Sequence, residues 1–166
     1  AEAHATKLTS RMAKLVNGEA VYLPITGIVS TEAARDVLLS DASVQPALNL
    51  FDHVTTALVG IGAIDPSPLL AQSGNIFSDE ENELLRENNA VGDILYRFFD
   101  SQGELVHTGL ENRVISMSLE QLKKVNRAIG IAGGARKYAG ILGALRGKWV
   151  NILITDCDTA KKLAKE

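Results

Sequence analysis

The stretch RAIGIAGGARKYAGILGALRG, residues 127–147, decides the fold. It opens with a short apolar run that predicts a strand, passes through two adjacent glycines, and continues as an alanine-rich segment with helical spacing. A strand that turns directly into a helix is the repeating unit of α/β proteins. We therefore expect a strand over RAIGIA and a helix from Ala135 to Leu145.

The turn between these two elements is a candidate phosphate site. Gly133 and Gly134 have no side chains, so backbone N–H groups can approach an anion closely. The following helix would present its positive N-terminal end, and Lys137 in its first turn adds a full charge. The spacing matches neither the Walker A loop nor GxGxxG. The local pattern therefore also fits a tight turn beside a solvent-exposed lysine.

The rest of the chain alternates predicted strands and helices. The continuous apolar run TTALVGIGAI, residues 55–64, is typical of a strand buried on both faces of a parallel sheet. Capping boxes at Ser78 and Ser118 predict two helix starts, and Asp156 or Asp158 can cap a final helix. We further expect helices over 3–16, 32–39 and 44–53, strands over 20–25, 113–118 and 150–155, and a hairpin over 93–107 with its turn at 100–103. This order predicts an α/β fold with a mostly parallel, Rossmann-like sheet and helices on both faces.

Composition limits the classes of function. The 166 residues suit a single domain, and the formal net charge of −3 argues against binding of DNA or of an anionic membrane by this chain. No apolar run approaches the ~20 residues that a membrane helix needs. The single cysteine, Cys157, excludes an intrachain disulfide and fits a reducing compartment. Motifs for metal ligation or for an activated nucleophile are absent from the sequence, so we expect no metal, no cofactor and no catalytic residue.

Two further segments carry candidate binding residues. Gly60 and Gly62 end the apolar run, where backbone could lie against a ligand, with Asp65 and Ser67 as nearby hydroxyl partners. Close packing of the strand against a loop would explain the same glycines. Asp93 precedes the predicted hairpin, and its carboxylate could accept hydrogen bonds from sugar hydroxyls or act only as a turn or capping residue.

Several segments, taken together and in order, resemble a known family. ALVGIGAI, NNAVGDILYRFFDSQGELV, IGIAGGARKYAGILGALRG and VNILITDCDTAKKL are similar to the C-terminal sugar-binding domain of SorC/DeoR-type bacterial transcriptional regulators. The resemblance runs from about Leu15 to the end of the chain. It implies a fold related to sugar-phosphate isomerases and CoA transferases, in a cytoplasmic regulator.

The resemblance also implies roles for single residues. Lys137 would contact the phosphate of a phosphorylated sugar effector, and Asp93 would contact the sugar. The glycines at 60, 62, 133 and 134 would line the same pocket. Effector binding would modulate homo-oligomerisation, as a dimer or a tetramer, and so control the binding of operator DNA.

The family's effector domain is usually longer than 166 residues and is preceded by a helix-turn-helix. We therefore expect residues 1–166 to be the C-terminal part of one effector domain, with operator DNA bound only through a domain outside this chain. Two alternatives remain at this stage. The chain could be an isomerase-like or deaminase-like enzyme, for which Asp93 is the attractive general base, or a pure oligomerisation domain.

Overall fold

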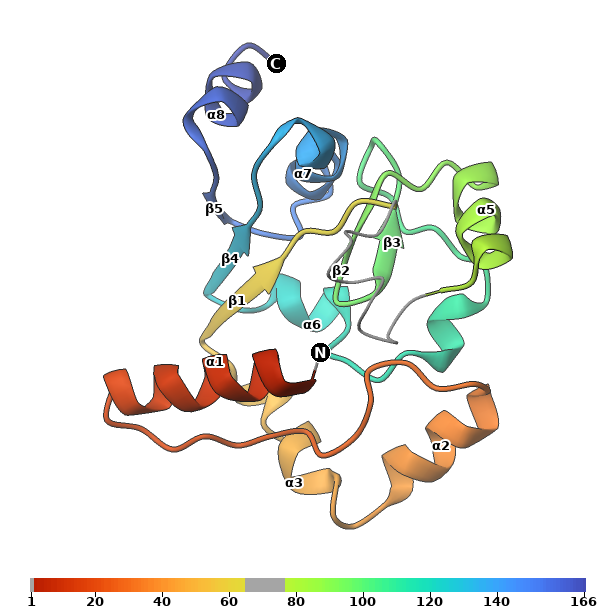
Figure 1. Ribbon diagram of the computed structural model, residues 1–166, viewed down its shortest axis with the longest axis vertical. Coiled ribbons are helices and arrows are strands. Elements are labelled where there is room, and N and C mark those ends of the chain that lie inside the picture. Colours follow the sequence, from red (N-terminus) through yellow and green to blue (C-terminus); the bar gives the residue numbers. More distant parts are fainter. Residues whose placement is uncertain (1, 65–76) are drawn as a thin grey trace.

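A parallel sheet of three strands forms the centre of the molecule. The computed structural model describes residues 2–64 and 77–166. The strand order is β1 (Thr56–Gly60), β4 (Arg127–Ile131) and β5 (Ile152–Ile154), as Figure 1 shows. The pairing runs from Thr56 opposite Arg127 to Gly60 opposite Ile131, so β1 and β4 end together. The mixed α/β class that the sequence predicted is confirmed.

Smaller elements surround the sheet. A short antiparallel pair consists of β2 (Gly92–Ile94) and β3 (Arg97–Phe99). The α-helices are α1 (Glu2–Leu15), α2 (Glu32–Ser40), α3 (Gln45–Leu48), α5 (Asp79–Glu87), α6 (Leu119–Lys123), α7 (Tyr138–Arg146) and α8 (Cys157–Leu163). Turns of 3-10 helix lie at η1 (Phe51–His53), η2 (Leu110–Arg113) and η3 (Ala135–Lys137). None of the described helices is both long enough and apolar enough to cross a membrane.

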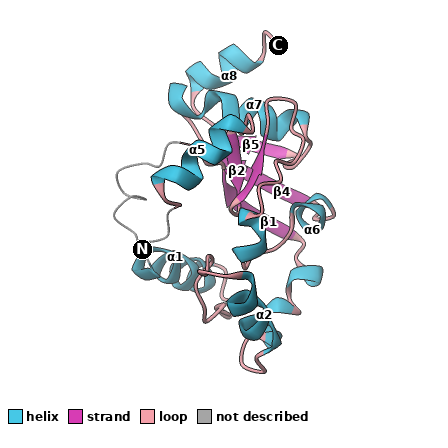
Figure 2. Ribbon diagram, turned by 90° about the vertical axis from the view of Figure 1, so that its right-hand side faces the viewer, coloured by secondary structure: helices cyan, strands magenta, loops and turns pink. Residues whose placement is uncertain are grey.

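The core lies on one face of the sheet, against the β2–β3 pair, α6 and α7 (Figures 1 and 2). Along β1 the burial alternates, with Ala57 and Val59 buried and the residues between them exposed. Elements from both halves of the chain fill this core. Its largest fully buried members are Ile94, Phe99, Leu122 and Ile141.

The opposite face of the sheet is open to solvent. The exposed fractions are 49% for Leu58, 46% for Ile131, 40% for Ile152 and 53% for Ile154. The prediction of helices on both faces is therefore wrong for the part of the chain that the structure describes. An apolar strand pattern indicates only that a face of the sheet is suited to burial. None of the described segments covers this face.

Local signals predicted the helices better than the strands. The predicted helices over 3–16 and 32–39 are confirmed as α1 and α2, and both capping boxes form, at Ser78 of α5 and at Ser118 of α6. The predicted helix over 44–53 is interrupted and becomes α3 and η1.

Two predicted strands are wrong. Residues 20–25 lie outside any strand or helix, and in 113–118 only Val114 forms a bridge, to Ile28. A strand needs a partner along its length, and sequence pattern alone does not supply one.

The predicted hairpin forms with its first turn in a different place. β2 and β3 are joined at Leu95 and Tyr96, whose φ angles are +56° and +61°. The residues predicted as the turn, 100–103, make a second reversal that brings Leu105 back to Phe99. Positive φ at both central residues usually selects glycine or asparagine, which is why the sequence did not point to the Leu95-Tyr96 turn.

Candidate functional site

Three loops meet at the carboxyl edge of the sheet. Gly62 lies just after β1, Gly133 and Gly134 follow β4, and Asp156 follows β5. Because the three strands are parallel, these loops share one edge, which is where α/β sheets bind their ligands. Asp93 of β2 joins them, because the Gly62 N–H donates a hydrogen bond to the Asp93 carbonyl oxygen over 2.8 Å.

The Asp93 carboxyl group sits directly over Gly62. A Cβ atom built on Gly62 would lie 1.5 Å from Asp93 Oδ1, so a side chain at this position would displace the carboxyl group. The other oxygen, Oδ2, accepts a hydrogen bond from the Tyr96 N–H over 3.1 Å. The sequence offered ligand approach or close packing for Gly62, and close packing against Asp93 is what the structure contains.

The electrostatics of Asp93 are unusual for an aspartate. Although the residue keeps partial contact with solvent, its carboxyl group is surrounded by protein, and this burial raises its pKa from 3.8 to about 6. The Tyr96 N–H and, to a smaller extent, the positive charge of Lys137 oppose that rise. The partial burial of Lys137 lowers the pKa of its ammonium group, and the Asp93 charge opposes that change in turn. The two charged groups therefore interact.

Close glycine contacts fix α7 beside Asp93. A Cβ on Gly140 of α7 would lie 2.7 Å from the Gly62 carbonyl oxygen, and one on Gly92 would lie 2.7 Å from the Gly140 Cα. The backbones of α7, β2 and the end of β1 can approach this closely only without side chains. Since Lys137 immediately precedes α7, this packing brings the predicted lysine and the predicted aspartate into one region.

The paired glycines form the turn before Lys137. Gly134 has φ +89° and ψ 153°, a conformation that residues with side chains rarely adopt. Its N–H donates a hydrogen bond to Asp156 Oδ2 over 2.7 Å, so it points at a carboxylate of the protein. From the sequence, Asp156 could form an acid–base pair with Asp158, but helix capping explained it more simply. Its loop follows a predicted strand and so was expected at the same edge of the sheet as the glycine turn, but the hydrogen bond to Gly134 was not predicted.

The remaining candidates lie apart from this region or outside the described residues. Gly60 is exposed, and a Cβ there would meet nothing within 4 Å, so packing does not require glycine. Asp65 and Ser67 lie outside the described residues. Cys157 is an exposed free cysteine. Within the described ranges, no group of three or more potential metal ligands gathers.

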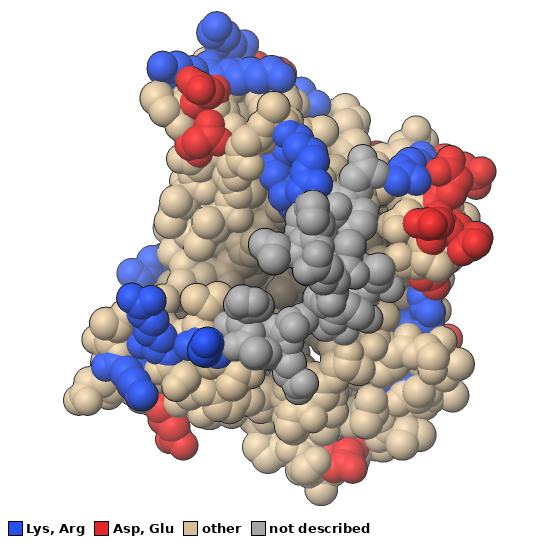
Figure 3. Space-filling model, in the orientation of Figure 1, with Lys and Arg blue, Asp and Glu red and all other residues tan. Residues whose placement is uncertain are grey.

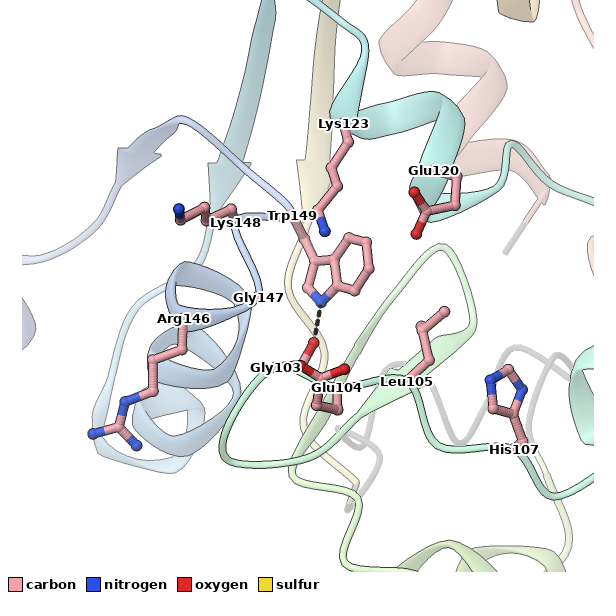
Figure 4. Close-up of a pocket in the computed structure, with 10 residues that line it drawn as sticks. All are labelled: Gly103, Glu104, Leu105, His107, Glu120, Lys123, Arg146, Gly147, Lys148 and Trp149. Atoms are coloured by element: carbon pink, nitrogen blue, oxygen red, sulfur yellow. Dashed lines mark hydrogen bonds between the residues drawn. The ribbon is translucent and has the colours of Figure 1, made fainter.

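A hollow of about 620 Å³ lies around the indole of Trp149 and contains none of the predicted site residues (Figure 4). The indole N–H donates to the Gly103 carbonyl oxygen over 2.9 Å, and Lys123 Nζ lies 3.9 Å from the ring centroid. Its charged lining residues carry both signs: Glu104, Glu120, Lys123, Arg146 and Lys148. The polar end of the indole is already used within the protein, so this hollow is the weaker candidate.

Charges of both signs share the face drawn in Figure 3. Basic side chains gather over α1 and α8, whereas acidic side chains gather over α5. The first turn of α5 alone holds three of these acids, Asp79, Glu80 and Glu81. This distribution differs from the one-signed stripe typical of a nucleic-acid interface.

Comparison with known proteins identifies a family that matches this chain. The family described as "Putative sugar-binding domain" matches residues 1–165. The sorbitol operon regulator of Klebsiella pneumoniae is 32% identical over 165 residues, which cover 98% of this chain and 51% of that protein. The deoxyribonucleoside regulator of Bacillus subtilis is 34% identical over 145 residues, covering 87% of this chain and 46% of that protein. The chain thus spans about half the length of these curated relatives.

Solved structures agree in fold. A probable sor operon regulator from Shigella flexneri superposes with a TM-score of 0.86 at 32% identity, over 95% of this chain and 61% of that one. The full-length sorbitol operon regulator from Klebsiella pneumoniae also gives a TM-score of 0.86, at 30% identity, over 95% of this chain and 50% of that one.

Proposed function

Because this chain belongs to the sugar-binding-domain family of SorC/DeoR-type transcriptional regulators, we propose that it binds a phosphorylated sugar as the effector of such a regulator. Binding would favour one oligomeric state of the whole protein, a dimer or a tetramer. That state would in turn set the affinity for operator DNA, through a domain that lies outside this chain. A regulator of this kind works in the cytoplasm.

One observation carries the proposal: the packing of α7 against β2 and the end of β1 brings Lys137 close enough to Asp93 for the charge of each residue to shift the pKa of the other. A phosphate group needs a cation, and Lys137 follows the glycine turn at the start of α7. Sugar hydroxyls need acceptors, and a carboxylate such as that of Asp93 accepts them well. A phosphorylated sugar offers both groups in one molecule.

The raised pKa of Asp93 also favours a second candidate. A carboxyl group with a pKa of about 6 can act as a general base near neutral pH, as a sugar-phosphate isomerase or deaminase requires. The characterised relatives named above are regulators, which favours binding without turnover. Incubation of the chain with sugar phosphates in D₂O separates the candidates, because an isomerase would exchange the proton beside the carbonyl group. We expect no exchange.

Thermal unfolding with phosphorylated sugars and their unphosphorylated parents tests the proposal directly. A ligand present at ~100 times its dissociation constant should add about 2.7 kcal/mol to the free energy of unfolding. We expect stabilisation by phosphorylated compounds only. Stabilisation by both members of each pair would contradict a role for the phosphate.

Lys137→Met then tests the assigned cation. Loss of a hydrogen bond between charged groups costs about 1.5–3 kcal/mol, so the affinity for the phosphorylated sugar should fall at least about tenfold. Lys161→Met is the matched control, because Lys161 is an exposed cation in the last turn of α8. Equal losses in the two variants would show a general charge effect and would overturn the assignment of Lys137.

A further inference from the structure

Asp156 makes more hydrogen bonds than helix capping requires. Its Oδ1 accepts the backbone N–H groups of Asp158 over 3.1 Å and Thr159 over 2.9 Å, and these two bonds cap α8. Its Oδ2 accepts the Gly134 N–H over 2.7 Å and the Thr159 hydroxyl over 2.6 Å. Capping therefore accounts for one oxygen, whereas the other connects α8 to the glycine turn after β4.

The geometry of that turn makes the connection tight. A Cβ on Gly133 would lie 2.7 Å from Asp156 Oδ2, so the carboxylate lies against the backbone of both glycines. These hydrogen bonds, led by the one from the Thr159 hydroxyl, hold the pKa of Asp156 well below its usual range. The carboxylate consequently stays ionised at physiological pH and remains a strong acceptor for the Gly134 N–H.

Gly134 is in turn hydrogen-bonded to Lys137. The Lys137 N–H donates to the Gly134 carbonyl oxygen over 2.9 Å, which starts the helical turn that leads into α7. The orientation of the Gly134 peptide units therefore sets the position of the Lys137 backbone. Gly134 reaches that orientation through a positive φ, which an unrestrained chain would leave readily.

The helix α8 and the residues that follow it are also attached to α7. The Tyr138 hydroxyl donates to Glu166 Oε1 over 2.9 Å, and Arg146 Nη2 lies 3.3 Å from Glu166 Oε2. The ammonium of Lys162 lies 3.7 Å from the centroid of the Tyr138 ring. Asp156 thus holds the turn from a helix that is attached to α7 at a second place.

We infer that Asp156 is a positioning residue for effector binding, which holds Gly134 so that the charge of Lys137 stays close to Asp93. The inference rests on the proposed function for the importance of Lys137, but the geometry can be tested without any ligand. Asp156 itself does not contact the effector in this scheme.

Asp156→Ser separates the two roles of the carboxylate. Serine caps helices about as well as aspartate, so α8 should keep its start. Its single, shorter side-chain oxygen cannot cap α8 and also accept the Gly134 N–H. Thr159→Val is the matched control, because it removes the hydroxyl that donates to the same Oδ2 and leaves the bond from Gly134 in place.

The first measurement is the pKa of Asp93, followed by NMR of its carboxyl carbon in the whole chain. The Lys137 charge lowers this pKa, so Lys137→Met should raise it, and Asp156→Ser should raise it in the same direction. Thr159→Val should leave it unchanged. Loss of the negative charge at 156 would by itself lower the pKa of Asp93, so a rise reports displacement of Lys137.

The second measurement is a titration with inorganic phosphate, followed through the amide signals of residues 133–138. We expect at least about tenfold weaker binding for Asp156→Ser and unchanged binding for Thr159→Val. Unchanged pKa of Asp93 in Asp156→Ser, or phosphate binding within twofold of the parent chain, would overturn the inference. Absence of phosphate binding by the parent chain would instead refute the proposed function, and the Asp93 titration would still decide the role of Asp156.

Discussion

Asp93→Asn should stabilise the protein at neutral pH and abolish the effector binding proposed above. The carboxyl group has a pKa of about 6 in the folded protein against 3.8 in an unfolded chain. At ~1.36 kcal/mol for each pH unit of that difference, ionised Asp93 costs the folded state about 3 kcal/mol. Asparagine carries no charge to desolvate, and its side-chain oxygen can still accept the Tyr96 N–H.

The sign of the pH dependence follows from the direction of the pKa change. Because folding raises this pKa, the cost is present in full above about pH 6 and disappears as the pH falls below 3.8. Asp93→Asn should therefore be more stable than the parent chain near neutral pH by up to about 3 kcal/mol. The two proteins should approach equal stability near pH 4.

Urea unfolding of both proteins at several pH values measures this difference. Asp36→Asn is the control, because Asp36 is an exposed carboxylate on α2 and its loss should give no comparable pH-dependent gain. A constant difference between parent and Asp93→Asn from neutral pH to about pH 4 would refute the burial argument. Unchanged affinity of Asp93→Asn for a phosphorylated sugar would refute the binding role of the carboxylate.

Two further substitutions test the packing around the site. Gly140→Ala should destabilise the protein by about 1–3 kcal/mol in urea unfolding, because its Cβ would lie 2.7 Å from the Gly62 carbonyl oxygen. Equal or greater stability would show that the helix propensity of alanine outweighs this contact. Trp149→Phe should lower the free energy of unfolding by about 1–3 kcal/mol, because the Gly103 carbonyl oxygen loses its hydrogen bond from the indole N–H. Unfolding monitored by circular dichroism measures this loss. A smaller loss than about 0.5 kcal/mol would indicate that water replaces the donor.

Elements whose cause lies within a few neighbouring residues could be predicted from the sequence. The capping box of α5 needs only Ser78 and a glutamate three residues later, and it forms as predicted. Elements that depend on a partner far along the chain could not be predicted in this way. Residues 20–25 have a strand-like pattern but meet no neighbouring strand, and the sheet face that exposes Ile154 has no cover among the described residues.

Part of the candidate site could likewise be predicted from neighbouring residues, and part could not. Gly133, Gly134 and Lys137 stand out locally, because glycines before a helix are a recognisable phosphate pattern. Their relation to Asp93 came from a family resemblance, and in the structure the Lys137 charge is close enough to lower the pKa of Asp93. The bond between Asp156 and Gly134 joins residues 22 positions apart, and capping alone was a sufficient local explanation for that aspartate.

The unfavourable features of this structure gather around Asp93, and their common location supports a binding site there. Its carboxyl group is buried in the region where the glycines at 62, 92 and 140 press three backbones together. The turn that follows puts Leu95 and Tyr96 at positive φ, a strained conformation for both residue types. The carboxylate that accepts the Tyr96 N–H also helps to hold this turn. The buried carboxyl group and the strained turn each cost folding free energy, and a core built for stability alone would avoid both. Natural proteins accept such costs mainly at functional sites, so their coincidence beside Lys137 supports the binding site proposed above.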